Sequence, residues 1–218
     1  MSAVRVFAPP PLPPVDRREV WRYAGIRNRL EGEPQLPQQG EAAAALLEDC
    51  LAEVLPTLRC RLAHVEYPLL IEGDRLDLGF AAVQSAALAR CMAGCSRFVL
   101  FGATIGQGLD RLLLKHGRRA PASALLCQAI GAERIEALCD AFTEALEAEV
   151  SPRGLFLRPR FSPGYGDLPL TLQREILRAL DSPRTLGITL NRSLLMSPSK
   201  SVTAIIGLGP LQGSPPQR

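Results

Sequence analysis

The residues best suited to bind a ligand lie in one short loop, Arg158-Pro-Arg-Phe-Ser-Pro-Gly-Tyr-Gly-Asp167. Arg160 carries a planar guanidinium that matches a carboxylate or a phosphate. Proline fixes one φ angle here and the two glycines permit positive φ, so the loop N–H and C=O groups could be aimed at a heterocycle. The alternative is an ordinary turn with a surface arginine. The candidate ligand-binding residues are Arg160, Ser162, Pro163, Gly164, Tyr165, Gly166 and Asp167.

A second turn is centred on Pro198 and places hydroxyl groups and an ammonium group between two apolar stretches. Ser199, Lys200 and Ser201 form this candidate second loop and could bind an anion. A solvated hairpin, with serine side chains bonded to the backbone, explains the same residues.

Three acidic residues, Glu133, Glu136 and Asp140, lie in one predicted helix. Glu136 and Asp140 are four positions apart and share a helix face. These carboxylates could hold an ammonium group or a metal ion, although a solvated acidic face near Arg134 is the simpler alternative. Glu133 and Glu136 are the candidate partners for a ligand's amino group.

Other chemistries lack their residues. Only two histidines are present, His64 and His116, so a Cys-His zinc module has too few ligands. The six cysteines contain no C-x-x-C pair, and we expect reduced thiols, with a redox or zinc module as the alternative. The glycines of 102–108 match neither phosphate-loop pattern, and no G-x-S-x-G occurs. We therefore predict no catalytic residues and no metal site.

Composition limits the class of protein. A chain of 218 residues with 47% hydrophobic residues can bury the core of a single domain. A net charge of +3 is too small to indicate a nucleic-acid surface. No apolar run of about 18 residues and no signal-peptide pattern occurs. We therefore expect a cytoplasmic protein that binds neither nucleic acid nor membrane.

Hydrophobic periodicity predicts an α+β fold. Helices and strands interleave irregularly, with hairpins, which favours one domain with a twisted antiparallel or mixed sheet and flanking helices. Proline-rich ends predict disordered tails at 1–15 and 210–218 around a domain at 16–209, with a polar linker at 31–40. Helices are predicted at 16–25, 41–58, 86–93, 109–116, 123–150 and 172–180, and strands at 62–71, 75–80, 97–101, 155–160, 186–190 and 202–208.

Five segments resemble small stand-alone relatives of the activation domain of cobalamin-dependent methionine synthase. The resemblance covers roughly residues 16–209, and its most specific piece is Arg-x-x-Pro-Gly-Tyr at 160–165. It implies the fold of that domain. The segments are Glu19-Val-Trp-Arg-Tyr-Ala-Gly25, Phe101-Gly-Ala-Thr-Ile-Gly106, Ala129-Ile-Gly-Ala-Glu-Arg-Ile-Glu136, Arg160-Phe-Ser-Pro-Gly-Tyr-Gly-Asp167 and Pro198-Ser-Lys-Ser-Val-Thr-Ala-Ile-Ile-Gly207.

The same resemblance implies a binding site for S-adenosylmethionine. Arg160 would meet the methionine carboxylate, the backbone of 162–164 would meet adenine, and Tyr165 would face cobalamin. In the family, an acidic residue of the N-terminal motif binds the ligand's amino group. Arg22-Tyr23 occupies that neighbourhood here, with Asp16 and Glu19 nearby.

The implied function is reductive reactivation, by remethylation, of cob(II)alamin on a separate methionine synthase or related corrinoid methyltransferase. The partner would supply cobalamin, and a donor such as flavodoxin or ferredoxin would supply the electron. A sulfonium methyl group is already activated and cob(I)alamin is a strong nucleophile, so this transfer needs positioning more than proton transfer. If the chain is part of an enzyme, it belongs to a methyltransferase system in methionine biosynthesis. The alternative is a non-catalytic docking protein for a cobalamin-binding module, without useful S-adenosylmethionine affinity.

Overall fold

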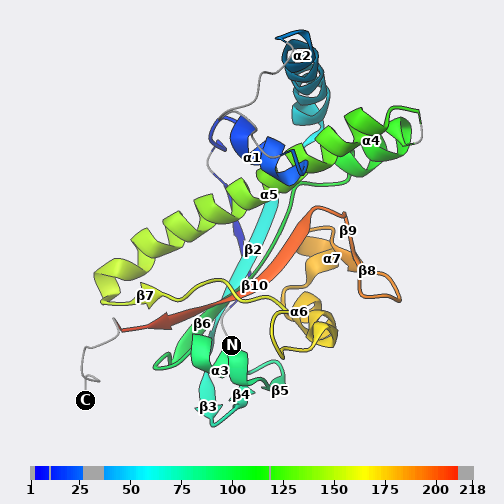
Figure 1. Cartoon of the computed structure of the whole chain (residues 1–218). Helices are drawn as coiled ribbons and strands as arrows, with labels where there is room; N and C mark the ends of the chain where they lie inside the picture. Colours follow the sequence, from blue (N-terminus) through cyan, green and yellow to red (C-terminus); the bar gives the residue numbers. More distant parts are fainter. Residues whose placement is uncertain (1–2, 10, 27–36, 118, 211–218) are drawn as a thin grey trace.

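A five-stranded antiparallel sheet forms the centre of the molecule (Figure 1). The computed structural model describes residues 3–9, 11–26, 37–117 and 119–210. The mixed helix and strand content and the antiparallel sheet confirm the predicted α+β fold. In sheet order the strands are β1 (Arg5–Phe7), β2 (Arg61–Pro68), β6 (Arg97–Thr104), β10 (Ser201–Gly209) and β7 (Phe156–Leu157).

The middle strand, β6, is buried from Phe98 to Thr104, as expected for a continuous apolar run covered on both faces. Its register aligns Leu100 with Val65 of β2 and with Ile205 of β10. These three residues face one core. The residues directly before and after each of them on its strand face a second core on the other side of the sheet.

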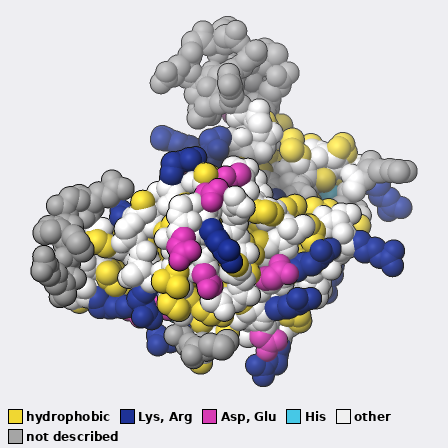
Figure 2. All heavy atoms as spheres, turned by 90° about the horizontal axis from the view of Figure 1, so that it is seen from below, with side chains coloured by type: hydrophobic (Ala, Val, Ile, Leu, Met, Phe, Trp, Pro, Cys, Tyr) yellow, Lys and Arg dark blue, Asp and Glu magenta, His cyan; other side chains and the backbone are white. Residues whose placement is uncertain are grey.

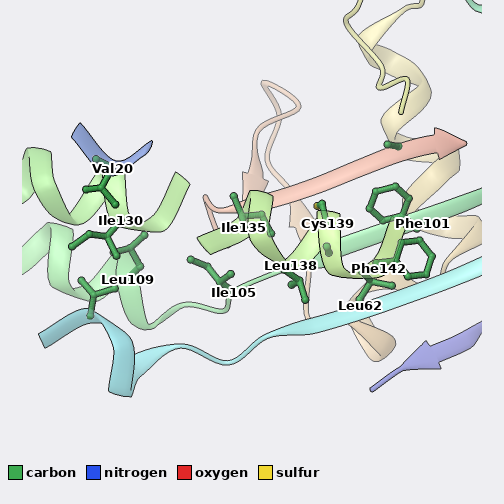
Figure 3. Packing of buried hydrophobic residues seen from close by; sticks show 14 of the residues in the cluster. Val20, Leu62, Phe101, Ile105, Leu109, Ile130, Ile135, Leu138, Cys139 and Phe142 are labelled. Carbon is green, nitrogen blue, oxygen red and sulfur yellow. The ribbon is translucent and has the colours of Figure 1, made fainter. Parts of the chain in front are cut away.

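One face of the sheet is covered by α5 (Pro121–Val150), a helix of 30 residues. Figure 3 shows Leu138 and Phe142 of α5 pointing toward Leu62 and Phe101 of the strands. The first half of α5 also packs against α1 (Arg17–Tyr23), α2 (Pro37–Val54) and α4 (Gly108–His116). The single-turn helix Leu55–Thr57 follows α2, and Ser151–Arg153 follows α5.

The opposite face carries smaller elements. A three-stranded sheet of β3 (Leu70–Glu72), β4 (Arg75–Asp77) and β5 (Ala82–Gln84) lies with α3 (Ala86–Cys91) at one end in Figure 1. Next along the sheet lie the turn Leu170–Leu172, α6 (Gln173–Ala179), α7 (Ser182–Thr185) and the hairpin of β8 (Thr189–Leu190) and β9 (Met196–Ser197). Leu172 and Ile176 belong to the same core as Leu100, Val65 and Ile205.

The prediction of a disordered tail over 1–15 is wrong at residues 5–7. β1 pairs with β2, and the Phe7 ring lies edge-on to that of Phe142 at a centroid distance of 5.3 Å. The strand precedes the prolines, which therefore do not interrupt its ladder. Further along, the Arg134 guanidinium donates to the carbonyl of Pro13 at 2.7 Å. Residues 211–218 of the second predicted tail lie outside the described residues.

Several element boundaries also differ from the predicted ones. The linker expected at 31–40 lies outside the described residues at 31–36, and α2 begins at Pro37, a favoured first helical residue. The strand predicted at 62–71 divides after Pro68 between two sheets. The strand predicted at 155–160 is limited to Phe156–Leu157, since Pro159 has no N–H to donate to a neighbouring strand. The strand predicted at 186–190 is limited to Thr189–Leu190, since the helix α7 ends only at Thr185.

Acidic and basic side chains are interspersed on the surface that Figure 2 shows. Within the described ranges, no helix combines the length and the apolar character needed to cross a membrane. All six cysteines belong to the described residues, and none of them forms a disulfide bond.

Candidate functional site

A pocket of about 390 Å³ opens between α5, the 158–167 loop, the start of α6 and β10. Its volume is that of a small-molecule site. Of the sequence-predicted residues, Glu136, Arg160, Ser162, Pro163, Tyr165 and Ser201 line it. The fold therefore gathers residues from distant parts of the chain around one cavity.

Arg160 is anchored to α5 by two carboxylates. Its Nη2 donates to Glu136 Oε2 at 3.0 Å and to Asp140 Oδ1 at 2.9 Å. The shared helix face of Glu136 and Asp140 therefore faces the arginine. A guanidinium has five N–H donors, so donors remain for a ligand carboxylate. Arginine and acidic groups stand together at this end of the pocket.

Glu133, the other candidate for the ligand's amino group, lies outside this pocket. Glu133 is 6% exposed, and its carboxylate pairs with the guanidinium of Arg134 and accepts the backbone N–H of Asp16 at 3.0 Å. Glu133 is one helix turn before Glu136 and lines the adjoining groove beside the N-terminal segment.

A wider groove of about 690 Å³ adjoins the pocket, and Glu136 lines both. The nearby acidic residues of the N-terminal segment line this groove. Asp16 caps α1 by accepting the N–H of Arg18 at 2.9 Å, and Glu19 pairs with Arg22 at 2.5 Å. Both carboxylates are therefore engaged in local structure.

The loop between Phe161 and Leu168 closes on itself. Gly164 and Gly166 have φ angles of +92° and +54°, as the sequence predicted for glycines there. The Gly164 N–H donates to Leu168 O at 2.9 Å, and the Tyr165 N–H donates to Ser162 O at 3.1 Å. The N–H groups of Gly164 and Tyr165 are therefore engaged within the loop. The Tyr165 side chain is 66% exposed at the rim.

Asp167 turns away from the pocket and fixes the loop to α3. Its carboxylate accepts the backbone N–H groups of Ala86 at 2.8 Å and Ala87 at 3.1 Å, and the hydroxyl of Ser85. The Ser85 hydrogen bond, followed by the backbone bonds, holds the pKa of Asp167 below its usual value. Asp167 therefore does not line the pocket, and its hydrogen bonds join the loop to the start of α3. Gly166 permits the close approach, since a Cβ there would lie 2.8 Å from Ala87 Cβ.

The second predicted loop reaches the pocket only through Ser201, whose hydroxyl donates to Pro198 O at 2.8 Å. The Ser199 N–H donates to Asp110 of α4 at 3.2 Å. The Lys200 side chain lies over Gly131 of α5, where burial lowers the pKa of its ammonium group and Asp110 partly offsets that effect. Ser199 and Lys200 therefore join the second loop to α4 and α5.

Two residues of the pocket, Gln173 and Thr203, escaped the sequence analysis. They are 6% and 2% exposed, and both line the cavity. The one available signal was the alternation of Ser201 and Thr203 in an otherwise apolar strand, which puts two hydroxyls on one face. Nothing in the sequence distinguished Gln173 from other polar residues at a helix start.

No protein-family model matches the chain, and no curated protein matches it either. A solved structure of the MetH reactivation domain bound to AdoHcy matches with a TM-score of 0.65 at 16% sequence identity. The match covers 90% of this chain and 73% of that chain. This chain therefore has the fold of that reactivation domain, which confirms the fold that the sequence resemblance implied.

Proposed function

We propose that this chain binds S-adenosylmethionine and S-adenosylhomocysteine (AdoHcy) in the pocket beside Arg160. The observation that carries the proposal is the grouping of Arg160 with Glu136 and Asp140, whose oxygens lie 3.0 and 2.9 Å from the guanidinium. The amino-acid end of the ligand is a zwitterion, so it needs a cation for its carboxylate and an anion for its ammonium group. A structural neighbour of the same fold that is bound to AdoHcy supports this choice.

The ligand carboxylate would take the unused donors of Arg160, and its ammonium group would take Glu136 or Asp140. The Arg160 side chain is only 28% exposed, so water would compete little for the charge-assisted hydrogen bonds that its unused donors make to the ligand carboxylate. The adenosine part would then extend along the 162–165 loop toward the interior. Tyr165 would lie beside the open end, where a methyl acceptor could approach.

The chain's contribution to methyl transfer would be positioning. When bound, S-adenosylmethionine supplies an electrophilic methyl group. Arg160 and the loop would hold the sulfonium end in one orientation, so that a partner's nucleophile meets it at a fixed angle. We propose that the partner is a cobalamin-dependent methionine synthase or related corrinoid protein, reduced by a donor such as flavodoxin or ferredoxin. The chain would serve the reactivation of that partner.

Isothermal titration calorimetry with AdoHcy tests the binding step. A folded sample should give a saturable, one-site heat. Absence of heat at millimolar AdoHcy, in a sample whose circular dichroism shows the folded state, would contradict the proposal. The docking alternative predicts that outcome together with capture of a purified cobalamin-binding module.

A further inference from the structure

Two polar atoms in the pocket are buried without a hydrogen-bond partner in the described part of the chain. They are Oε1 of Gln173, the first residue of α6, and Oγ1 of Thr203 in β10. More than nine-tenths of each residue is buried, and both line the cavity. Buried polar atoms nearly always have a partner, so an orphan pair in a cavity indicates the place of a ligand or an ordered water.

The two side chains share one face of the sheet. Thr203 has the same strand parity as Ile205, and Ile205 belongs to the core that contains Ile176 of α6. Gln173 lies one turn before Ile176 on that helix. Gln173 and Thr203 therefore approach the pocket from the α6 side, whereas Glu136 approaches from α5 on the other side.

The edge of β10 beside the pocket has no neighbouring strand at Thr203 in the described part of the chain. Ile205 exchanges hydrogen bonds with Phe161, at 2.8 and 2.9 Å. Alternate residues of a strand direct their N–H and C=O groups to the same edge, so those of Thr203 point to the edge where Phe161 lies. Across the described residues, pairing along that edge begins only at Ile205. Thr203 thus adds a free backbone donor and acceptor to its hydroxyl.

We propose that Gln173 recognises the adenine ring of the ligand, an assignment that rests on the proposed function. A primary amide presents an acceptor and a donor side by side, which matches the 6-amino group and the adjacent ring nitrogen of adenine. Gln173 Oε1 accepts a hydrogen bond from the 6-amino group, and Nε2 donates to the ring nitrogen. Thr203 contributes its hydroxyl and edge groups beside the same ring.

The loop backbone offers few N–H donors to the ligand. Pro163 has no N–H, and the Gly164 N–H is bonded to Leu168 O at 2.9 Å. The loop therefore offers mainly carbonyl acceptors, whereas the ring nitrogens of adenine are themselves acceptors and need donors. The amide of Gln173 supplies a donor from the other side of the pocket.

The test compares two ligands on two proteins by calorimetry. The ligands are AdoHcy and its 6-deamino analogue, in which hydrogen replaces the amino group. Wild type should bind AdoHcy about ten-fold more tightly than the analogue, the scale of one buried hydrogen bond. Gln173→Met keeps the side-chain length without the amide and should bind both ligands within about two-fold. Gln128→Met, on the exposed part of α5, should discriminate like wild type.

The outcomes separate the two proposals. If wild type binds both ligands equally, or if Gln173→Met discriminates as wild type does, the assignment of Gln173 is overturned while AdoHcy binding stands. If wild type does not bind AdoHcy, both the proposed function and this assignment fail. Equal binding of the two ligands by wild type overturns the assignment even where Gln173→Met does not fold.

Discussion

Arg160 and Asp140 form an ion pair of 2.9 Å that ties the loop after β7 to the middle of α5. Glu136, one helix turn earlier, shares the same guanidinium nitrogen at 3.0 Å. Both carboxylates are substantially exposed, at 42% and 63%, so the pairs add little to stability. Their consequence is geometric: the guanidinium is held at the end of the pocket before a ligand arrives.

Replacing Arg160 should separate binding from folding. We expect Arg160→Ala to weaken AdoHcy binding by about 2–5 kcal/mol, as for removing one partner of a hydrogen-bonded charge pair. The free energy of unfolding should change by less than about 1 kcal/mol, because the lost pairs are partly exposed. Calorimetry and urea titration measure the two quantities. Arg160→Lys is the matched control. It keeps the positive charge but lacks the planar guanidinium, so its AdoHcy affinity should lie between those of wild type and Arg160→Ala.

The negative charge of Glu136 should contribute to binding through the ligand's ammonium group. Glu136→Gln is expected to weaken AdoHcy binding, because the amide cannot balance the ammonium charge. It should leave unchanged the affinity for an AdoHcy analogue that lacks the amino group. The control is Glu144→Gln, an exposed carboxylate of the same helix outside the pocket. Equal losses for both ligands would show that Glu136 only supports Arg160.

Asp167 should make the stability of the loop depend on pH. Its folded pKa lies below its usual value, with the Ser85 hydroxyl as the main cause. The ionised form therefore stabilises the fold fully above the unfolded pKa of about 3.9, and that contribution is lost as the pH falls through the folded pKa. Thermal unfolding should show Asp167→Ala melting below wild type at pH 7, with the difference narrowing under acid conditions. A difference in melting temperature that does not change with pH would contradict a stabilising role for the ionised carboxylate of Asp167.

The cysteines of α5 should be inert in the folded protein. Burial raises the pKa of Cys127 and of Cys139 to about 12, so neither forms a thiolate near neutral pH. A thiol-specific reagent at pH 8 should modify the partly exposed Cys60 and Cys91 first, and the α5 thiols only after denaturation. Rapid native labelling of Cys139 would revive the alternative of a redox module.

Periodic burial made the main elements predictable. The apolar spacing along α5 and the unbroken run in β6 each specify a buried face, which is a property of the local sequence. Glycines were harder to interpret. The sequence assigns no role to the glycines of 102–108, but Gly106 adopts a φ of +84° and a Cβ on Gly108 would lie 2.3 Å from Thr57 O. These glycines permit tight packing, which depends on a neighbour far away in the sequence.

The candidate site could be predicted only where its residues lie close together in one segment of the sequence. The 158–167 loop carries Arg160 and the positive-φ glycines together, so its shape could be inferred. Helix spacing placed Glu133 and Glu136 on one helix but could not show that the N-terminal segment covers Glu133 alone. Gln173 and Thr203 line one pocket because α6 and β10 contribute to the same core, and no short-range pattern in the sequence indicates that arrangement.

A crystal structure of the chain grown with AdoHcy is the most direct test of the central claim. We expect the ligand in the pocket lined by Glu136, Arg160 and Tyr165, with its carboxylate within hydrogen-bond distance of the Arg160 guanidinium. Density for AdoHcy at another surface, or a pocket that holds only solvent at saturating ligand, would contradict the account.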